Sequence, residues 1–232
     1  MKKRFRSLSL TLLAGMIGAS FAKADTIYSD LGPPAAPYFD ANGRAVTGSG
    51  LGFPGYQEVA VPFTPTGSYD LTEIDLAVTF SGIPSVFGTD AATVTLESSV
   101  AGAPGASIAS WNISSLPSSF TGTTLDSISV SGVSVTAGAQ YWLVVSPTNN
   151  NGNTSDTDDF WDTNSNPAGV FGNEQINNGG GWVSLAPYDL AAFDVLGTPV
   201  PEPASASLAI AGFALVAIGC AKARRKAKSQ TL

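Results

Sequence analysis

Apolar and polar residues alternate in short runs between residues 25 and 199 of the chain. The clearest run covers residues 72–80, where every second residue is apolar: Ile74, Leu76, Val78 and Phe80. Neighbouring side chains of a β-strand point to opposite faces. The alternation therefore predicts a strand with one face toward a core and the other toward solvent.

Further runs of this kind combine β-branched residues with small polar ones. They lie at 58–63, 93–98, 107–113, 125–135, 140–146, 181–185 and 191–196. Turn-forming residues separate them at 81–84, 103–105, 137–138 and 177–181, whereas 30–55 and 147–166 have the composition of long loops. Because no helical period interrupts the series, we expect an all-β domain, an antiparallel β-sandwich of jelly-roll type.

The first 24 residues have the three parts of a signal peptide. Four basic residues lie within the first six, an apolar run follows at 10–17, and Ala22-Lys23-Ala24 ends the segment. Small residues one and three positions before a bond suit signal peptidase, so we expect cleavage after Ala24. The alternative is an uncleaved anchor, for which the apolar run is short.

Residues 200–232 also have three parts. The segment Val200-Pro201-Glu202-Pro203 precedes an uncharged stretch, 204–221, whose 18 residues would span about 27 Å as a helix. That length matches a hydrocarbon core, so we predict a transmembrane helix there. The basic tail, 222–232, would hold its cations on the cytoplasmic side: Lys222, Arg224, Arg225 and Lys226. This places the domain at 25–199 outside the membrane; a plain tail anchor would have the same topology.

The charge of the chain is unevenly distributed. Residues 25–199 hold 17 acidic residues and a single basic one, Arg44, a net charge of −16. Such a surface repels phosphate backbones, which excludes nucleic-acid binding by an electrostatic route. It favours solubility and cationic or neutral partners.

The composition also limits catalysis. The chain has no histidine, and its one cysteine, Cys220, lies in the apolar C-terminal stretch. Catalysis by Ser-His-Asp or Cys-His groups and zinc sites built from His or Cys are therefore excluded within this chain. A glycosidase with paired carboxylates remains open, but the spacing of the acids singles out no pair. We predict that the protein is not an enzyme.

The best candidate metal site is the acidic segment 153–162. It contains four carboxylates that could supply hard oxygen ligands to calcium: Asp156, Asp158, Asp159 and Asp162. The segment lacks the glycine and the distal glutamate of an EF-hand. The alternative is a solvated acidic loop that keeps the protein soluble.

Two of the four tryptophans are candidates for stacking on a sugar ring. Trp161 and Trp182 lie beside polar or glycine-rich segments, where ligand-binding side chains concentrate. Trp111 and Trp142 lie within predicted strands, so we expect them to pack in the structure.

The C-terminal segment resembles the PEP-CTERM sorting domain of Gram-negative bacteria. The resemblance rests on Val200-Pro201-Glu202-Pro203, the apolar stretch and the arginine-containing basic end, in that order. It implies recognition of Pro201, Glu202 and Pro203 by an exosortase, a membrane peptidase. It also implies export through an inner-membrane-anchored precursor to the cell surface or to a polysaccharide-rich extracellular matrix.

The domain itself resembles the choice-of-anchor R family. The matching segments are 26–28, 94–96, 104–105, 138–145, Trp161, 179–182 and 192–195. That family has no established activity to carry over. We therefore expect an exported, non-enzymatic protein with a structural or interaction role in the envelope or biofilm matrix. The alternative is a module that binds exopolysaccharide, with calcium as an optional aid.

Overall fold

The computed structural model describes residues 23–31, 39–51, 55–81, 90–117, 125–153, 156–164 and 170–201. These residues form sixteen strands and one short 3-10 helix, η1 (Ser49–Leu51), with no α-helix among them. The predicted helix at 204–221, the basic tail, Glu202, Pro203 and residues 1–22 lie outside this part. Within the described part, no helix is long and apolar enough to cross a membrane.

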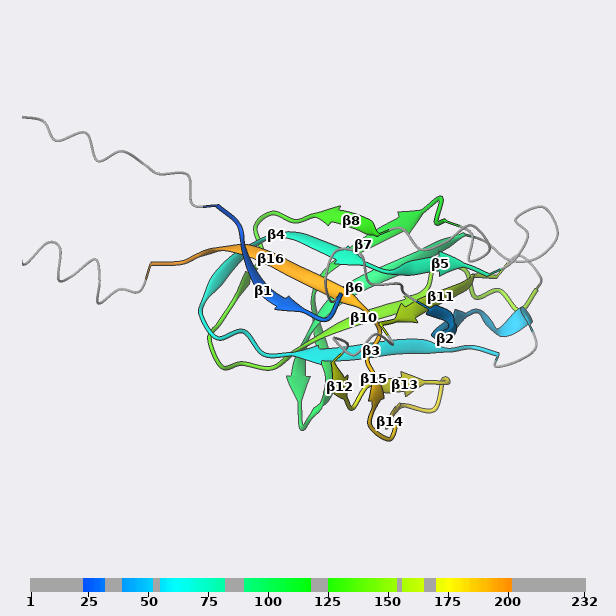
Figure 1. Ribbon diagram of the computed structural model, residues 1–232. Coiled ribbons are helices and arrows are strands. Elements are labelled where there is room, and N and C mark those ends of the chain that lie inside the picture. The colour runs from blue at the N-terminus through cyan, green and yellow to red at the C-terminus, as the bar shows by residue number, and fades with distance from the viewer. Residues whose placement is uncertain are drawn as a thin grey trace, which may run out of the picture.

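Two antiparallel sheets form the body of the sandwich (Figure 1). The first has the order β1-β16-β4-β8, with β9 also paired to β4: β1 (Asp25–Ser29), β16 (Phe193–Pro199), β4 (Tyr69–Leu76), β8 (Asp126–Ser129) and β9 (Ser134–Val135). The second has the order β14-β13-β3-β10-β6-β7: β14 (Trp182–Ser184), β13 (Gln175–Asn177), β3 (Glu58–Phe63), β10 (Tyr141–Pro147), β6 (Ala91–Val100) and β7 (Ala103–Ser114). The prediction of an all-β fold with antiparallel sheets is confirmed.

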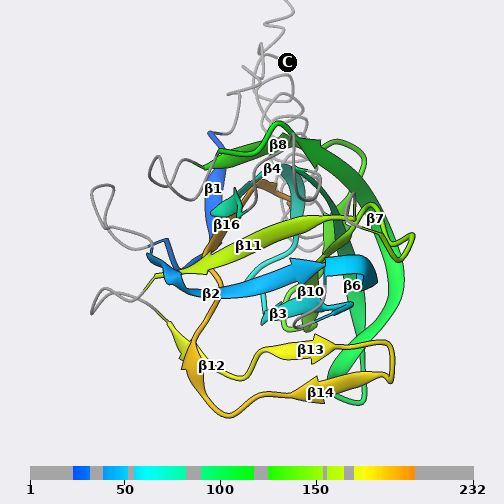
Figure 2. The same cartoon turned by 90° about the vertical axis from the view of Figure 1, so that its right-hand side faces the viewer.

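Two smaller sheets complete the described part. One has the order β2-β11-β5: β2 (Phe39–Thr47), β11 (Asp158–Thr163) and β5 (Val78–Phe80). The other pairs β12 (Phe171–Gly172) with β15 (Tyr188–Asp189). Figure 2 shows the β2-β11 pair crossing between the two larger sheets.

The apolar face of the predicted strand 72–80 lies in the core, because Ile74, Leu76, Val78 and Phe80 are all buried. The chain does not continue as one strand, however. It leaves the first sheet after Leu76 and joins the third sheet at Val78, and the backbone of Ala77 bonds to Ala192 and Asp162 in between. One segment of alternating apolar and polar residues thus contributes a strand to each of two sheets.

Three predictions about loops and turns are wrong in part. The expected loops 30–55 and 147–166 contain β2 and β11, which pair with each other. In β11 the expected alternation of apolar and polar residues is absent, because two of the buried positions are occupied by Asp159 and Asp162. The expected turn at 103–105 lies inside β7, and the reversal falls at Ala101 and Gly102, both with positive φ.

The two ends of the domain leave the sandwich side by side. Asp25 of β1 lies opposite Gly197 of β16, in neighbouring antiparallel strands. We call this the proximal end; it lies at the left of Figure 1. β10 runs from the proximal turn at 136–139 to Pro147, so the following residues 148–153 and η1 lie at the opposite, distal end.

Candidate functional site

Asp156 organises the loops of the distal end. Its carboxylate is buried and accepts hydrogen bonds of 2.7–2.9 Å from the backbone N–H groups of Gly50, Asn151 and Gly152. Burial alone would raise the pKa of Asp156, but the hydrogen bonds from these backbone amides outweigh it and lower the pKa below its usual value. The loops pack so closely here that a Cβ atom added at Gly48 would lie only 2.4 Å from the Cβ atom of Asp156. Asp156 therefore ties two loops together.

The other three predicted calcium ligands have separate surroundings. Asp162 is buried and accepts a hydrogen bond of 3.2 Å from the hydroxyl of Thr79. Asp159 is buried on the core side of β11, and Asp158 is half-buried. Among the described residues, no three acidic, histidine or cysteine side chains are placed to hold a metal ion. The described residues thus show no shared metal-binding arrangement of the four aspartates, and calcium binding by this segment stays a prediction.

Asp159 is the most unusual of these carboxyl groups. Neither of its side-chain oxygens has a hydrogen-bond partner. Burial, together with the nearby charges of Asp158, Asp90 and Asp126, raises the pKa of Asp159 to about 9. Its carboxyl group is therefore neutral at physiological pH.

The two tryptophans predicted to stack on a ligand are packed against the protein instead. Trp161 is fully buried, donates a hydrogen bond of 3.0 Å to the carbonyl of Ala192 and packs against Phe193. Trp182 covers a small apolar cluster on the outer face of the second sheet, formed with Ala60, Trp142 and Val144. The prediction for Trp161 is wrong because β11 is an inner strand and not a loop. The side chain of Trp182 is partly exposed, so stacking of a ligand on it stays a prediction.

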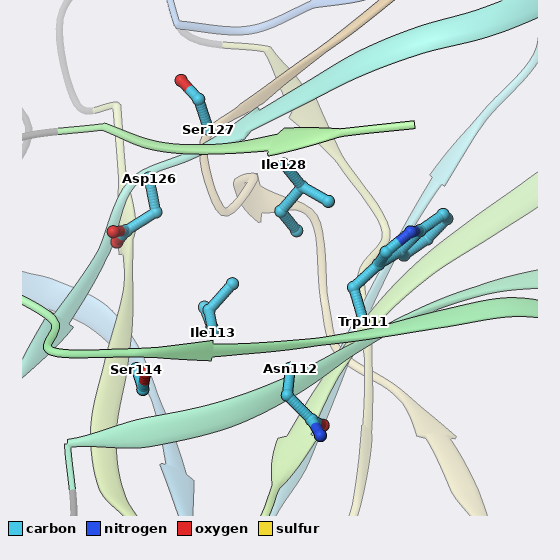
Figure 3. A pocket seen from close by; sticks show the side chains of 7 residues that line it. All are labelled: Trp111, Asn112, Ile113, Ser114, Asp126, Ser127 and Ile128. Carbon is cyan, nitrogen blue, oxygen red and sulfur yellow. The ribbon is translucent and has the colours of Figure 1, made fainter. Parts of the chain in front are cut away.

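The structure contains a cleft that the sequence did not predict. It opens between β7, the edge of the second sheet, and β8, the edge of the first sheet, and has a volume of about 410 Å³. Its lining residues come from these two strands: Trp111, Asn112, Ile113, Ser114, Asp126, Ser127 and Ile128. Figure 3 shows Trp111, Ile113, Asp126 and Ile128 pointing into the space, with the other three side chains directed away.

The cleft combines an aromatic face, an apolar floor and one carboxyl group. Ile113 and Ile128 are buried at its base, and Trp111 is partly exposed while packing against the core. The Oδ2 atom of Asp126 is buried without a hydrogen-bond partner. Burial raises the pKa of Asp126 to about 6, so its carboxyl group is mostly ionised at neutral pH and lacks a donor.

Arg44, the one basic residue of the domain, has a structural partner. Its guanidinium forms a salt bridge with the fully buried carboxylate of Glu174 and lies 5.2 Å from the ring centroid of Tyr188. A hollow of about 250 Å³ beside it is lined by Arg44, Thr163, Tyr188 and Asp189. Because Glu174 already neutralises the cation, this hollow offers no free positive charge to an anion.

A comparison with protein-family models and with curated proteins found no match to this chain. The resemblances to the PEP-CTERM sorting domain and to the choice-of-anchor R family therefore remain expectations from the sequence.

Proposed function

We propose that the protein is an exported, non-enzymatic β-sandwich that is displayed on the cell surface or in the extracellular matrix of a Gram-negative bacterium. In this proposal signal peptidase cuts after Ala24 and an exosortase processes the chain at Pro201, Glu202 and Pro203. The finer architecture that we propose is jelly-roll-like. Neighbours such as β4 and β16, or β3 and β10, lie far apart in the sequence, as crossing connections require.

The pairing of β1 with β16 carries this proposal. It brings the end of the predicted signal peptide and the start of the sorting motif to one end of the sandwich, where Pro201 is exposed. Cleavage at either end would then leave the paired strands and the core intact. A membrane helix at 204–221 would hold the proximal end near the bilayer and direct the distal loops away from it.

Two observations favour a role without catalysis. The chain has no histidine, and Asp126 is the one acidic residue among those that line the described cleft. Glycoside hydrolysis uses two carboxyl groups roughly 5–9 Å apart, and the lining of this cleft supplies one. Binding or structural functions need no such pair.

Intact-mass analysis of protein recovered separately from membranes and from extracellular matrix tests the proposal. We expect a matrix form that begins at Asp25 and ends within residues 201–203, and a full-length C-terminus in the membrane fraction. The variant Glu202→Ala should accumulate in membranes, whereas Val200→Ala, at an exposed residue that is not one of the three expected recognition residues, should be processed. A C-terminus intact in both fractions would contradict the proposal.

A further inference from the structure

We propose that the cleft between β7 and β8 binds a neutral polysaccharide, with one sugar ring stacked on Trp111 and a sugar hydroxyl donating a hydrogen bond to the carboxylate of Asp126. The inference does not depend on where the chain is displayed, so it stands or falls separately from the proposed export.

The shape of the cleft fits a small part of such a polymer. Its volume of about 410 Å³ lies within the range of roughly 300–1,000 Å³ that is typical of small-molecule sites. It lies between the edges of two sheets, and the side chains that point into it come from strands on both sides (Figure 3). A site built on strands holds its groups in fixed positions.

The chemistry of the lining fits a sugar better than a purely apolar ligand. A pyranose ring offers an apolar C–H face, which the indole of Trp111 and the side chains of Ile113 and Ile128 can cover. Its hydroxyl groups are donors, and the carboxylate of the half-buried Asp126, which points into the cleft, is an acceptor.

The charge of the domain selects against acidic polymers. Residues 25–199 carry a net charge of −16, and the one cation, Arg44, is bound to Glu174 away from the cleft. An anionic polysaccharide would be repelled by the surface and by the carboxylate of Asp126 itself. The favoured occupant is therefore uncharged.

Affinity electrophoresis of the full chain tests the inference. The chain, kept in a mild detergent, is run through native gels that contain dextran, mannan or xylan as neutral polymers, alginate as an anionic one and chitosan as a cationic one. We expect retardation by at least one neutral polymer and none by alginate. Failure of all three neutral polymers to retard the chain, or retardation by alginate or chitosan alone, would overturn the inference.

Variants locate the binding site. Trp111→Ala and Asp126→Asn should each weaken binding about tenfold or more, and Trp111→Phe, which keeps an aromatic face, should lose less. Trp182→Ala, at the opposite edge of the sheet that contains β7, should bind as the original chain does. Melting temperatures identify any variant that fails to fold. If Trp111→Ala does not fold, the binding of Asp126→Asn is the test of the site. Unchanged binding by a folded Trp111→Ala or Asp126→Asn variant would refute the assignment.

A pH series separates direct contact from a structural effect. Because the pKa of Asp126 is about 6, the carboxylate acceptor is lost below that pH and binding should weaken there. The Asp126→Asn variant should not show this change. Equal pH profiles of the two proteins would argue against a hydrogen bond from the ligand to Asp126.

Discussion

Asp159 makes the stability of the fold depend on pH in the direction opposite to that of an ordinary carboxylate. Its pKa rises from an ordinary value near 4 in the unfolded chain to about 9 in the folded protein. Between these values the folded state holds a proton that the unfolded state has released. The folded state binds more protons, so stability falls as pH increases through this range.

The size of the effect follows from linkage. One such group changes the free energy of unfolding by about 1.4 kcal/mol per pH unit, or about 4 kcal/mol between pH 5 and pH 8. The variant Asp159→Asn keeps the shape of the side chain and cannot ionise. We expect it to unfold at a higher urea concentration than the original chain at pH 8 and to show a flatter dependence of stability on pH.

Urea unfolding followed by tryptophan fluorescence at several pH values measures this difference. Asp70→Asn is the control, because Asp70 is an exposed aspartate of β4 and is not among the charges that raise the pKa of Asp159. It should change the slope far less. Parallel stability curves for Asp159→Asn and the original chain between pH 5 and pH 8 would refute the assignment of a neutral, buried Asp159.

Three further substitutions test other parts of the structure. Asp156→Ala should lower the free energy of unfolding by about 1–3 kcal/mol, because three backbone amides lose a charged hydrogen-bond acceptor, and proteolysis within residues 148–153 should speed up. Arg44→Met should cost about 3–5 kcal/mol in urea unfolding by leaving the Glu174 charge buried, and adding Glu174→Leu should restore most of that loss. Trp161→Ala should cost about 3–5 kcal/mol, measured in the same way, through the cavity that it leaves.

The sequence predicts the strands well where one face is apolar and the other polar. Residues 58–63 form β3 with the same bounds, and 140–146 form β10 within one residue at each end. It fails at β11, because the buried positions of that strand include Asp159 and Asp162. Acidic residues at core positions give the pattern of a loop.

The cleft could not be predicted from the sequence, because it depends on long-range pairing. β7 reaches it by pairing with β6, and β8 by pairing with β4, so that Trp111 and Asp126 face the same space from two different sheets. Trp111 itself alternates with polar residues as any packed strand residue would. No local signal distinguishes a tryptophan at the open edge of a sandwich from one in its core.

The place of β16 between β1 and β4 also has a mechanical consequence. Once the C-terminus is held at a membrane or matrix and the sandwich is bound elsewhere, tension pulls along β16 from Pro199. Hydrogen bonds between antiparallel strands lie perpendicular to the strands. A pull along β16 therefore loads all of its hydrogen bonds to β1 and β4 together and does not open them one at a time. An attachment at the C-terminus would thus act through the strand whose geometry spreads force over two neighbours.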